Sequence, residues 1–384
     1  MALWPSYVQT CFDTLRRAGY QAYLVGGCVR DLTLGRTPGD YDMATSARPE
    51  QVIALFPRTC PTGLKHGTVT VALDGNTLEV TTFRAENRYS DGRHPDSVRF
   101  VSSLEEDLAR RDFTMNAMAL GADEVLHDPF QGRADLKEGL IRCVGEAERR
   151  FQEDSLRMLR GLRFAAQLDF RLDPETARAM GRCVRQTDHL SAGRVRAEVE
   201  KLICAQSPQR GGELFSMGLM DRWLPRQAVD LTGLTRLVPA ALERWAGLCA
   251  LLEAEPGPLL QSLKTEKSLI SAGSAGWRLW RGGLPMDGLG WRKALAELGE
   301  AGCRAAAAMG DVSGGNFRAL LEETLDSGAC WTVGGLALSG GALRDLGFSG
   351  PEIGRVQSAL LEHVLRCPED NTPDRLKELA EKLR

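Results

Sequence analysis

The sequence has few of the features that mark membrane-bound, secreted or zinc-dependent proteins. No stretch approaches the roughly 18 unbroken apolar residues of a membrane-spanning helix, and the opening MALWPSYVQTCFDTLRR lacks the charged-then-apolar order of a signal peptide. The ten cysteines include no Cys-x-x-Cys pair and the five histidines are scattered, so neither a zinc site nor a disulfide framework is predicted. We expect free thiols, a cytoplasmic location, and oxygen ligands for any metal that is bound.

A large excess of charge is also missing. The formal net charge of -3 argues against a protein that coats nucleic acid nonspecifically, and neither DNA nor a membrane is an expected partner. Basic side chains gather between residues 178 and 210, where seven Lys or Arg face three Asp or Glu, whereas residues 340–384 hold seven against eight. Most of the 48 basic residues are Arg, whose planar guanidinium suits phosphate and base edges, although a GC-rich genome produces the same bias.

The length and the hydrophobic pattern predict several modules of two kinds. With 384 residues, the chain is too long for one hydrophobic core. The predicted strands are residues 23–27, 40–45, 68–73 and 77–83. The last two read as a hairpin around Asp74-Gly75-Asn76, and residues 28–35 read as a helix that ends at a glycine. From about residue 140 onward apolar residues recur at helical spacing, so an α+β domain followed by helical ones is predicted. Residues 255–315 contain no recognisable functional motif.

The first candidate site begins at the end of the first predicted strand. Gly26 and Gly27 leave backbone N–H groups uncovered for a triphosphate, and Arg30, one helical turn later, adds a charged donor. No third glycine completes G-x-G-x-x-G, so a dinucleotide-binding fold is not predicted. Asp40 and Asp42 lie two positions apart on a predicted strand, so their carboxylates point to one face, where a divalent cation would offset their repulsion.

A third carboxylate extends this site. Glu79 lies on the predicted hairpin next to that strand, where it could complete a two-metal site. The alternative interpretations are an exposed acidic turn for the Asp pair and an ordinary strand residue for Glu79. A two-metal carboxylate site suits phosphoryl transfer, because one ion activates the attacking hydroxyl and the other holds the triphosphate and its leaving pyrophosphate. The predicted reaction is therefore nucleotidyl transfer.

Two further clusters combine arginines with carboxylates. Residues 110–116 predict the start of a helix, and the alternative interpretation of Arg111 beside Asp112 is a plain surface pair that contributes little. The next cluster contains Glu153, Asp154, Arg157, Arg160 and Arg163. Helical spacing puts the first three on one face and makes the arginines a stripe one turn apart. This is either a solvent-exposed face with salt bridges or a base-reading site, in which Asp154 and Arg157, held together, offer an acceptor and donors to a Watson–Crick edge.

The motifs together resemble those of a known enzyme family. GGCVRD, LGRTPGDYDMAT, EVTTFR, DLARRDFTMNAMA, DPFQGRADL and RCVGEAERRFQEDSLRMLRGLRF follow one another between residues 23 and 164 in the order and spacing of the class II tRNA nucleotidyltransferase and poly(A) polymerase family. The resemblance implies an α+β, polymerase-β-like head followed by an all-helical neck, body and tail. It also implies an enzyme that adds CCA to tRNA 3′ ends from CTP and ATP without a nucleic-acid template.

The resemblance carries over to individual residues. Asp40 and Asp42 resemble the metal-binding catalytic pair and Glu79 the third catalytic acid, with Mg²⁺ as the implied ion. The implied nucleotide-binding residues are Gly27, Arg30, Arg111, Asp154, Arg157, Arg160 and Arg163. Beyond about residue 210 the resemblance thins to LALSGGALRDLGFSGPEIG in the tail.

The resemblance assigns base recognition and tRNA binding to different parts of the chain. Asp154 and Arg157 match the positions that read the base, and Glu153 matches the one that holds this arginine in place. The implied domains are a catalytic head at 1–139, a neck for base recognition at 140–207, a body at 208–315 and a tail at 316–384. Substrate tRNA is expected along the neck, the body and the tail.

Three departures from the family pattern bear on activity. Gly161 stands where Ala is usual, Gly193 replaces an acidic residue, and His94 replaces an Arg in the loop 91–95 that drives the switch from C to A addition in the family. Because this loop is present, full CCA addition is favoured over CC-only addition, with an A-adding specialist left open. A poly(A) polymerase is disfavoured because the tail lacks a basic extension, and a catalytically dead tRNA-binding protein because every motif carboxylate is intact.

Overall fold

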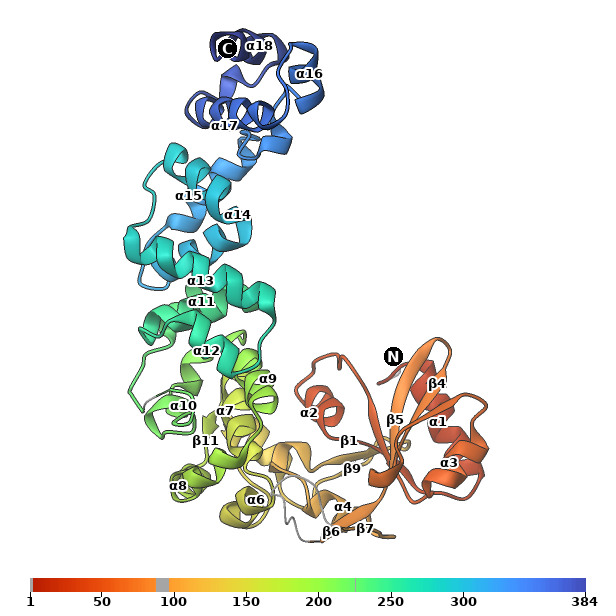
Figure 1. Cartoon of the computed structure of the whole chain (residues 1–384). Helices are drawn as coiled ribbons and strands as arrows, with labels where there is room; N and C mark the ends of the chain where they lie inside the picture. The colour runs from red at the N-terminus through yellow and green to blue at the C-terminus, as the bar shows by residue number, and fades with distance from the viewer. Residues whose placement is uncertain (1–2, 88–96, 225) are drawn as a thin grey trace. The chain divides into compact units, whose positions relative to one another are not determined.

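The computed structural model describes residues 3–87, 97–224 and 226–384 (Figure 1). The chain divides into two compact units. The first consists of residues 1–198 and 213–227, and the second of residues 199–212 and 228–384. The first unit contains the sheets, whereas the second has helices and no strand among its described residues. No helix in the described ranges is long and apolar enough to cross a membrane.

The first unit is built on a mixed seven-stranded sheet with the strand order β3-β4-β5-β2-β1-β8-β9. Its strands are β1 (Ala22–Val25), β2 (Asp42–Thr45), β3 (Thr59–Gly63), β4 (Thr68–Leu73), β5 (Asn76–Thr82), β8 (Ala119–Gly121) and β9 (Leu126–His127). β2 and β5 run parallel, and the other neighbours are antiparallel. The predicted hairpin is confirmed: Leu73 pairs with Asn76 across Asp74 and Gly75, whose φ values of 50° and 75° are those of a two-residue hairpin turn.

Helices flank this sheet because each presents one apolar face. In α1 (Ser6–Arg17) the buried residues Val8, Cys11, Phe12 and Leu15 recur every three or four positions and face β1. The other helices of the first 140 residues are α2 (Gly27–Thr33), α3 (Pro49–Leu55), α4 (Leu104–Ala109) and α5 (Gly132–Glu138). A second, two-stranded sheet pairs β6 (Arg84–Asn87) with β7 (Ser97–Phe100).

The rest of the first unit is mainly helical. Its helices are α6 (Ala147–Glu153), α7 (Leu156–Leu168), α8 (Pro174–Cys183), α9 (Ala192–Ile203), which continues into the second unit, and α10 (Glu213–Ser216). The short strands β10 (Leu140–Ile141) and β11 (Arg171–Leu172) pair in parallel. Gly161 has a packing role in α7, since a Cβ there would lie 2.8 Å from Cε of Met180 and 3.1 Å from Cζ of Phe113. Glycine lets this helix approach Phe113 closely.

Small residues allow helices of the second unit to pack closely. Its helices are α11 (Ala241–Leu251), α12 (Pro256–Ser262), α13 (Lys267–Gly282), α14 (Gly288–Asp311), α15 (Phe317–Asp326), α16 (Gly340–Asp345), α17 (Pro351–Arg366) and α18 (Pro373–Lys382). A Cβ on Gly276 of α13 would lie 2.7 Å from the Cβ of Ala305 and 2.9 Å from the oxygen of Gly302, both in α14. Residues 255–315 therefore form helices whose Gly and Ala residues allow close crossing.

Several local expectations need correction. Asp40 precedes β2, so only Asp42 of the predicted pair lies on the strand. Residues 114–116 form a single 3₁₀ turn in place of the helix start expected at 110–116. The helix expected to carry residues 153–163 is interrupted between α6 and α7. The helical nature of the chain beyond residue 140 is confirmed. The loop 91–95 lies outside the described residues, and the four-part domain division stays a prediction.

Candidate active site

Three carboxylates lie near one another on and beside the parallel strands β2 and β5, in the interior of the sheet. The Cα atoms of Asp42 and Glu79 are direct partners across the two strands, and Asp40 lies two residues before Asp42. Burial, then the charges of Asp40 and Glu79, raise the pKa of Asp42 to about 6, while Arg111 acts in the opposite direction. Mutual repulsion of this kind is what a bound cation removes, so the donor set fits a hard divalent ion held by oxygen ligands.

The turn between β1 and α2 borders these carboxylates. Gly26 has φ 75° and ψ -133°, a backbone conformation that L side chains rarely adopt. A Cβ at this position would lie 3.2 Å from Nη1 of Arg111 and 4.0 Å from Oδ2 of Asp42. Glycine therefore lets the turn approach both charged groups. The next residue, Gly27, begins α2 and would place a Cβ 3.7 Å from Nη2 of Arg30.

Arg111 is held by a buried acid that the sequence did not reveal. Asp107, on α4, is fully buried and accepts hydrogen bonds from Nη2 of Arg110 at 2.8 Å and from Nη2 of Arg111 at 3.2 Å. Burial alone would raise the pKa of Asp107, but the two arginines bring it below its ordinary value. The Nε of Arg111 is buried with no partner among the described atoms.

Three of the predicted arginines surround one aromatic ring. The guanidinium carbons of Arg30, Arg160 and Arg163 lie 5.3, 5.5 and 3.8 Å from the centre of the Phe164 ring. An aromatic face attracts cations, so Phe164 favours this accumulation of like charge. Arg30 comes from α2 and the other two from α7, so residues distant in sequence meet at one ring. Among described residues, Glu198 pairs with Arg163 at 2.5 Å.

Asp112 connects this arginine cluster. Its Oδ2 accepts from Nε and Nη2 of Arg160 at 2.9 and 2.7 Å, and its Oδ1 accepts from Nδ2 of Asn116 at 3.2 Å. The Oδ1 of Asn116 accepts in turn from Nη1 of Arg30 at 3.0 Å. Although burial alone would raise the pKa of Asp112, Arg160 and then Arg157 lower it to about 2. The alternative of a plain Arg111–Asp112 surface pair does not hold, because Asp112 is buried and bonded to Arg160.

Arg157 and Asp154, the residues expected to read the base, are bonded to different partners. Nη1 of Arg157 donates to Oε2 of Glu153 at 2.9 Å, and Nη2 donates to the backbone oxygen of Arg110 at 3.0 Å. Asp154 instead accepts from Nη2 of Arg194 at 2.7 Å. The expectation that Asp154 and Arg157 lock onto each other was therefore wrong. The arrangement of Glu153 beside Arg157 agrees with the expected support, whereas Arg194 was missed because its partner lies 40 residues away in the sequence.

A mixed sheet that presents clustered carboxylates, followed by a helix that presents arginines, defines a nucleotidyltransferase of the polymerase-β type. The family described as the poly A polymerase head domain matches residues 22–142. The family described as a probable RNA and SrmB-binding site of polymerase A matches residues 169–231. The CCA-adding enzyme of Lactiplantibacillus plantarum is 37% identical over 382 residues, which cover 96% of this chain and 94% of that protein. The chain belongs to the CCA-adding enzymes of the tRNA nucleotidyltransferase and poly(A) polymerase family.

Other relatives agree with this assignment. The CCA-adding enzyme of Geobacillus stearothermophilus is 45% identical over 269 residues, which cover 68% of this chain and 67% of that protein. The crystal structure of the Bacillus stearothermophilus CCA-adding enzyme in complex with CTP matches with a TM-score of 0.79 at 35% identity, over 94% of this chain and 92% of that one. The Thermotoga maritima CCA-adding enzyme complexed with tRNA shares the fold, with a TM-score of 0.68 at 20% identity.

Proposed function

We propose that this chain adds C, C and A in turn to the 3′ end of tRNA, using CTP and ATP and releasing pyrophosphate, without a nucleic-acid template. The observation that carries this proposal is the likeness to a CCA-adding enzyme along 96% of the chain. The clustered carboxylates of Asp40, Asp42 and Glu79 support it, because the raised pKa of Asp42 fits a place for a cation. A tRNA substrate also implies that the enzyme works in the cytoplasm.

The carboxylates and the glycine turn form the reaction centre of this proposal. Asp40, Asp42 and Glu79 would hold Mg²⁺, which when bound favours deprotonation of the attacking hydroxyl and stabilises the charge on the triphosphate. The backbone at Gly27 and the side chains of the arginine cluster around Phe164 would bind the triphosphate. Guanidinium groups suit this task because they stay charged and donate two hydrogen bonds to one phosphate.

Base choice would depend on Asp154 and Arg157. Cytosine and adenine both present an amino donor beside a ring-nitrogen acceptor on the Watson–Crick edge, whereas uracil and guanine present an acceptor beside an N–H donor. A carboxylate oxygen of Asp154 can accept from the amino group, since each oxygen has more than one lone pair, and Arg157 can donate to the ring nitrogen. The ion pair of Arg157 with Glu153 at 2.9 Å fixes its direction. The same pair of side chains would thus accept CTP and ATP and reject UTP and GTP.

The domain assignment remains part of this proposal. We assign catalysis to residues 1–139 and base recognition to the neck at 140–207, with tRNA lying along this neck, the body at 208–315 and the tail at 316–384. The excess of basic residues between 178 and 210 supports tRNA contact there, since phosphate neutralisation dominates affinity for nucleic acid.

The decisive experiment follows product length on a tRNA transcript that ends at the discriminator base. The purified chain is incubated with Mg²⁺ and with CTP alone, ATP alone, or both. Growth by two nucleotides with CTP and by three with both nucleotides is the expected result. Arrest after CC with both nucleotides would indicate a CC-adding enzyme, extension only of a CC-ended transcript an A-adding one, and long ATP-only tails a poly(A) polymerase. Tight tRNA binding without incorporation would indicate a binding protein and overturn the proposal.

A further inference from the structure

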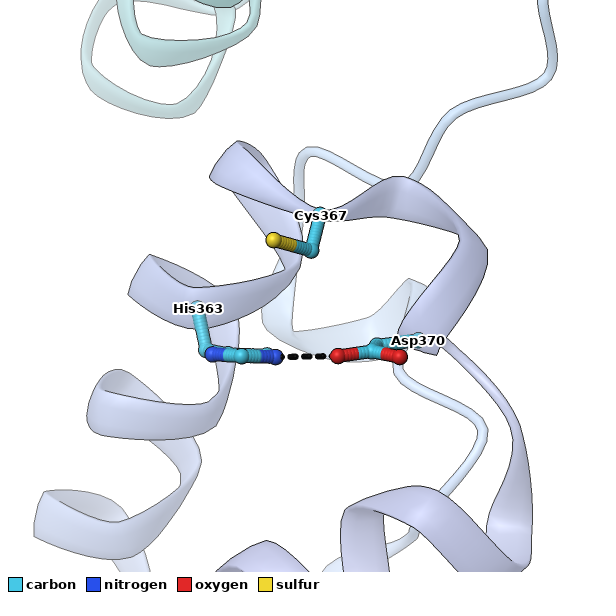
Figure 2. A group of neighbouring side chains, drawn as sticks. All are labelled: His363, Cys367 and Asp370. Atoms are coloured by element: carbon cyan, nitrogen blue, oxygen red, sulfur yellow. Dashed lines mark hydrogen bonds and ion pairs between the residues drawn. The ribbon is translucent and has the colours of Figure 1, made fainter.

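Three side chains of different chemistry meet at the C-terminal end of α17. His363 lies in the last turn of this helix, Cys367 directly follows it, and Asp370 ends the 3₁₀ turn Pro368–Asp370. One ligand atom from each of the three lies within 4.8 Å of those of the other two (Figure 2). The group therefore offers an imidazole nitrogen, a thiol sulfur and a carboxylate oxygen, the donors that zinc uses in proteins.

The backbone holds these three residues in successive turns. The N–H of Cys367 donates to the oxygen of His363 at 2.9 Å, and the N–H of Asp370 donates to the oxygen of Cys367 at 3.0 Å. Both ends of the segment are anchored within the second unit. Nε of Arg292 donates to the oxygen of Leu365 at 2.8 Å, and Nδ2 of Asn371 donates to the oxygen of Gly335 at 3.1 Å. The donor atoms are thus gathered on a backbone that other elements fix.

The spacing of the side chains suits a single ion. Nε2 of His363 lies 2.6 Å from Oδ2 of Asp370, whose Oδ1 lies 3.4 Å from Nε of Arg375. Ligand bonds of about 2.0 to 2.3 Å place tetrahedral zinc ligands roughly 3 to 4 Å apart, so shifts of about 1 Å would complete the geometry. The side chains of His363 and Asp370 are 33% and 24% exposed, which leaves an ion a way in.

We propose that His363, Cys367 and Asp370 bind one zinc ion at the end of α17 and leave its fourth position to water. A thiolate and an imidazole favour zinc over magnesium or calcium, which prefer oxygen ligands. The small core beside this site explains what the ion would contribute. Val364 of α17 and Leu376 of α18 belong to a cluster of nine buried residues between Leu336 and Ala380. A core this small gains stability from a metal that ties its helix ends together.

The probe for this site is Co²⁺, added to the full chain in the presence of excess Mg²⁺ so that the carboxylates of the first unit are occupied. A Co²⁺–thiolate bond gives a charge-transfer absorption that oxygen ligands do not give. We expect this band to saturate at a single ion per chain and to disappear when Zn²⁺ is added. Cys367→Ser should lose the band, whereas Cys330→Ser, at a half-buried cysteine packed against the same core, should keep it.

A second variant covers the case in which Cys367→Ser fails to fold. Asp370→Asn preserves the shape and a hydrogen bond to His363 but removes a charged ligand. We expect its affinity for Zn²⁺ to fall at least roughly tenfold, since even residues behind a ligand contribute about 10- to 100-fold. A wild-type chain without the band, a band that persists in Cys367→Ser, or unchanged Zn²⁺ affinity in Asp370→Asn would overturn the proposal. CCA addition with Mg²⁺ alone tests the proposed function separately.

Discussion

At the residue scale, the proximity of Asp40, Asp42 and Glu79 has an electrostatic effect on stability that should be measurable without any substrate. The pKa of Asp42 is raised from an ordinary 3.8 to about 6, by burial first and by Asp40 and Glu79 second. A raised carboxyl pKa stabilises the folded state fully below the ordinary value, and this contribution is lost as pH rises through 6. The metal-free native protein is therefore penalised by the ionised Asp42 at pH 8.

We predict that Asp42→Asn makes the metal-free protein more stable at pH 8, by on the order of 2 kcal/mol. The gain should fade on acidification and be small at pH 4, where Asp42 is protonated in the folded state and about half ionised in the unfolded one. Urea denaturation in EDTA at the two pH values measures it. Addition of Mg²⁺ should then stabilise the wild type more than the variant. Equal stability of the two proteins at pH 8 would show that Asp42 carries no such penalty.

Arg157 allows a test of base recognition at the same scale. Its guanidinium is held by Glu153 and by the backbone oxygen of Arg110. We predict that Arg157→Ala lowers the preference for CTP and ATP over UTP and GTP roughly 10- to 100-fold, because one good base contact contributes about 1 to 3 kcal/mol. Single-turnover rates with each nucleotide measure the preference. Arg178→Ala, at an exposed arginine paired with Glu175, is the control and should leave it unchanged.

If Arg157→Ala slows all four nucleotides by the same factor, the base is read elsewhere.

At the scale of elements, the turn between β1 and α2 combines an unusual backbone with a close approach to the site. We predict that Gly26→Ala destabilises the fold by about 1 to 3 kcal/mol and also reduces nucleotide addition, because its Cβ would crowd Arg111, 3.2 Å away. Gly19→Ala is the matched control, since Gly19 also has a positive φ of 85° but no atom within 4 Å of an added Cβ. Thermal unfolding and CCA addition are measured for both.

Gly19→Ala should lose stability while its folded fraction keeps normal activity. Normal activity in folded Gly26→Ala would show that the approach to Arg111 has no role in the reaction.

Some helices and strands can be predicted from the sequence and others cannot. The β4–β5 hairpin and α2 follow from local turn chemistry and apolar spacing, and both were predicted. The helix expected at 110–116 was not found, because the carboxylate of Asp112 accepts from the N–H of Phe113 at 2.8 Å. Asp154 likewise accepts from the N–H of Leu156 at 3.1 Å and divides α6 from α7. Aspartate side chains compete with the helix for backbone donors, and periodicity does not reveal which of them do so.

Some residues of the candidate site could likewise be predicted from the sequence, whereas others could not. Asp42 and Glu79 could be paired in advance because they lie on predicted strands with recognisable motifs. The bond from Arg194 to Asp154 and the packing of Arg30 against Phe164 depend on tertiary contacts between distant segments. His363, Cys367 and Asp370 were overlooked for another reason. Each belongs to a scattered residue type, and only the turn after α17 brings them together.

At the scale of the whole molecule, catalysis and tRNA binding depend on different kinds of side chain. Carboxylates repel a phosphate backbone, whereas exposed arginines attract it. Asp40, Asp42 and Glu79 lie on and beside the neighbouring strands β2 and β5, whereas the basic segment 178–210 belongs to the helices that follow the sheet in sequence. Substitution of a carboxylate should therefore abolish nucleotide addition and leave the affinity for tRNA almost unchanged. Substitution of an arginine in the basic segment should weaken the binding of tRNA.

We predict that Asp42→Ala abolishes addition of both C and A while the dissociation constant for tRNA changes by less than about twofold. The exposed Arg185, within the basic segment, provides the converse control. Arg185→Ala should weaken tRNA binding, and if this residue contacts a phosphate it should reduce the slope of log affinity against log salt by about one. Fluorescence anisotropy at several salt concentrations measures affinity, and primer extension measures activity. If Asp42→Ala weakened tRNA binding as much as Arg185→Ala, the carboxylates would have to contact tRNA even in the absence of nucleotide, and the separation of the two tasks would be wrong.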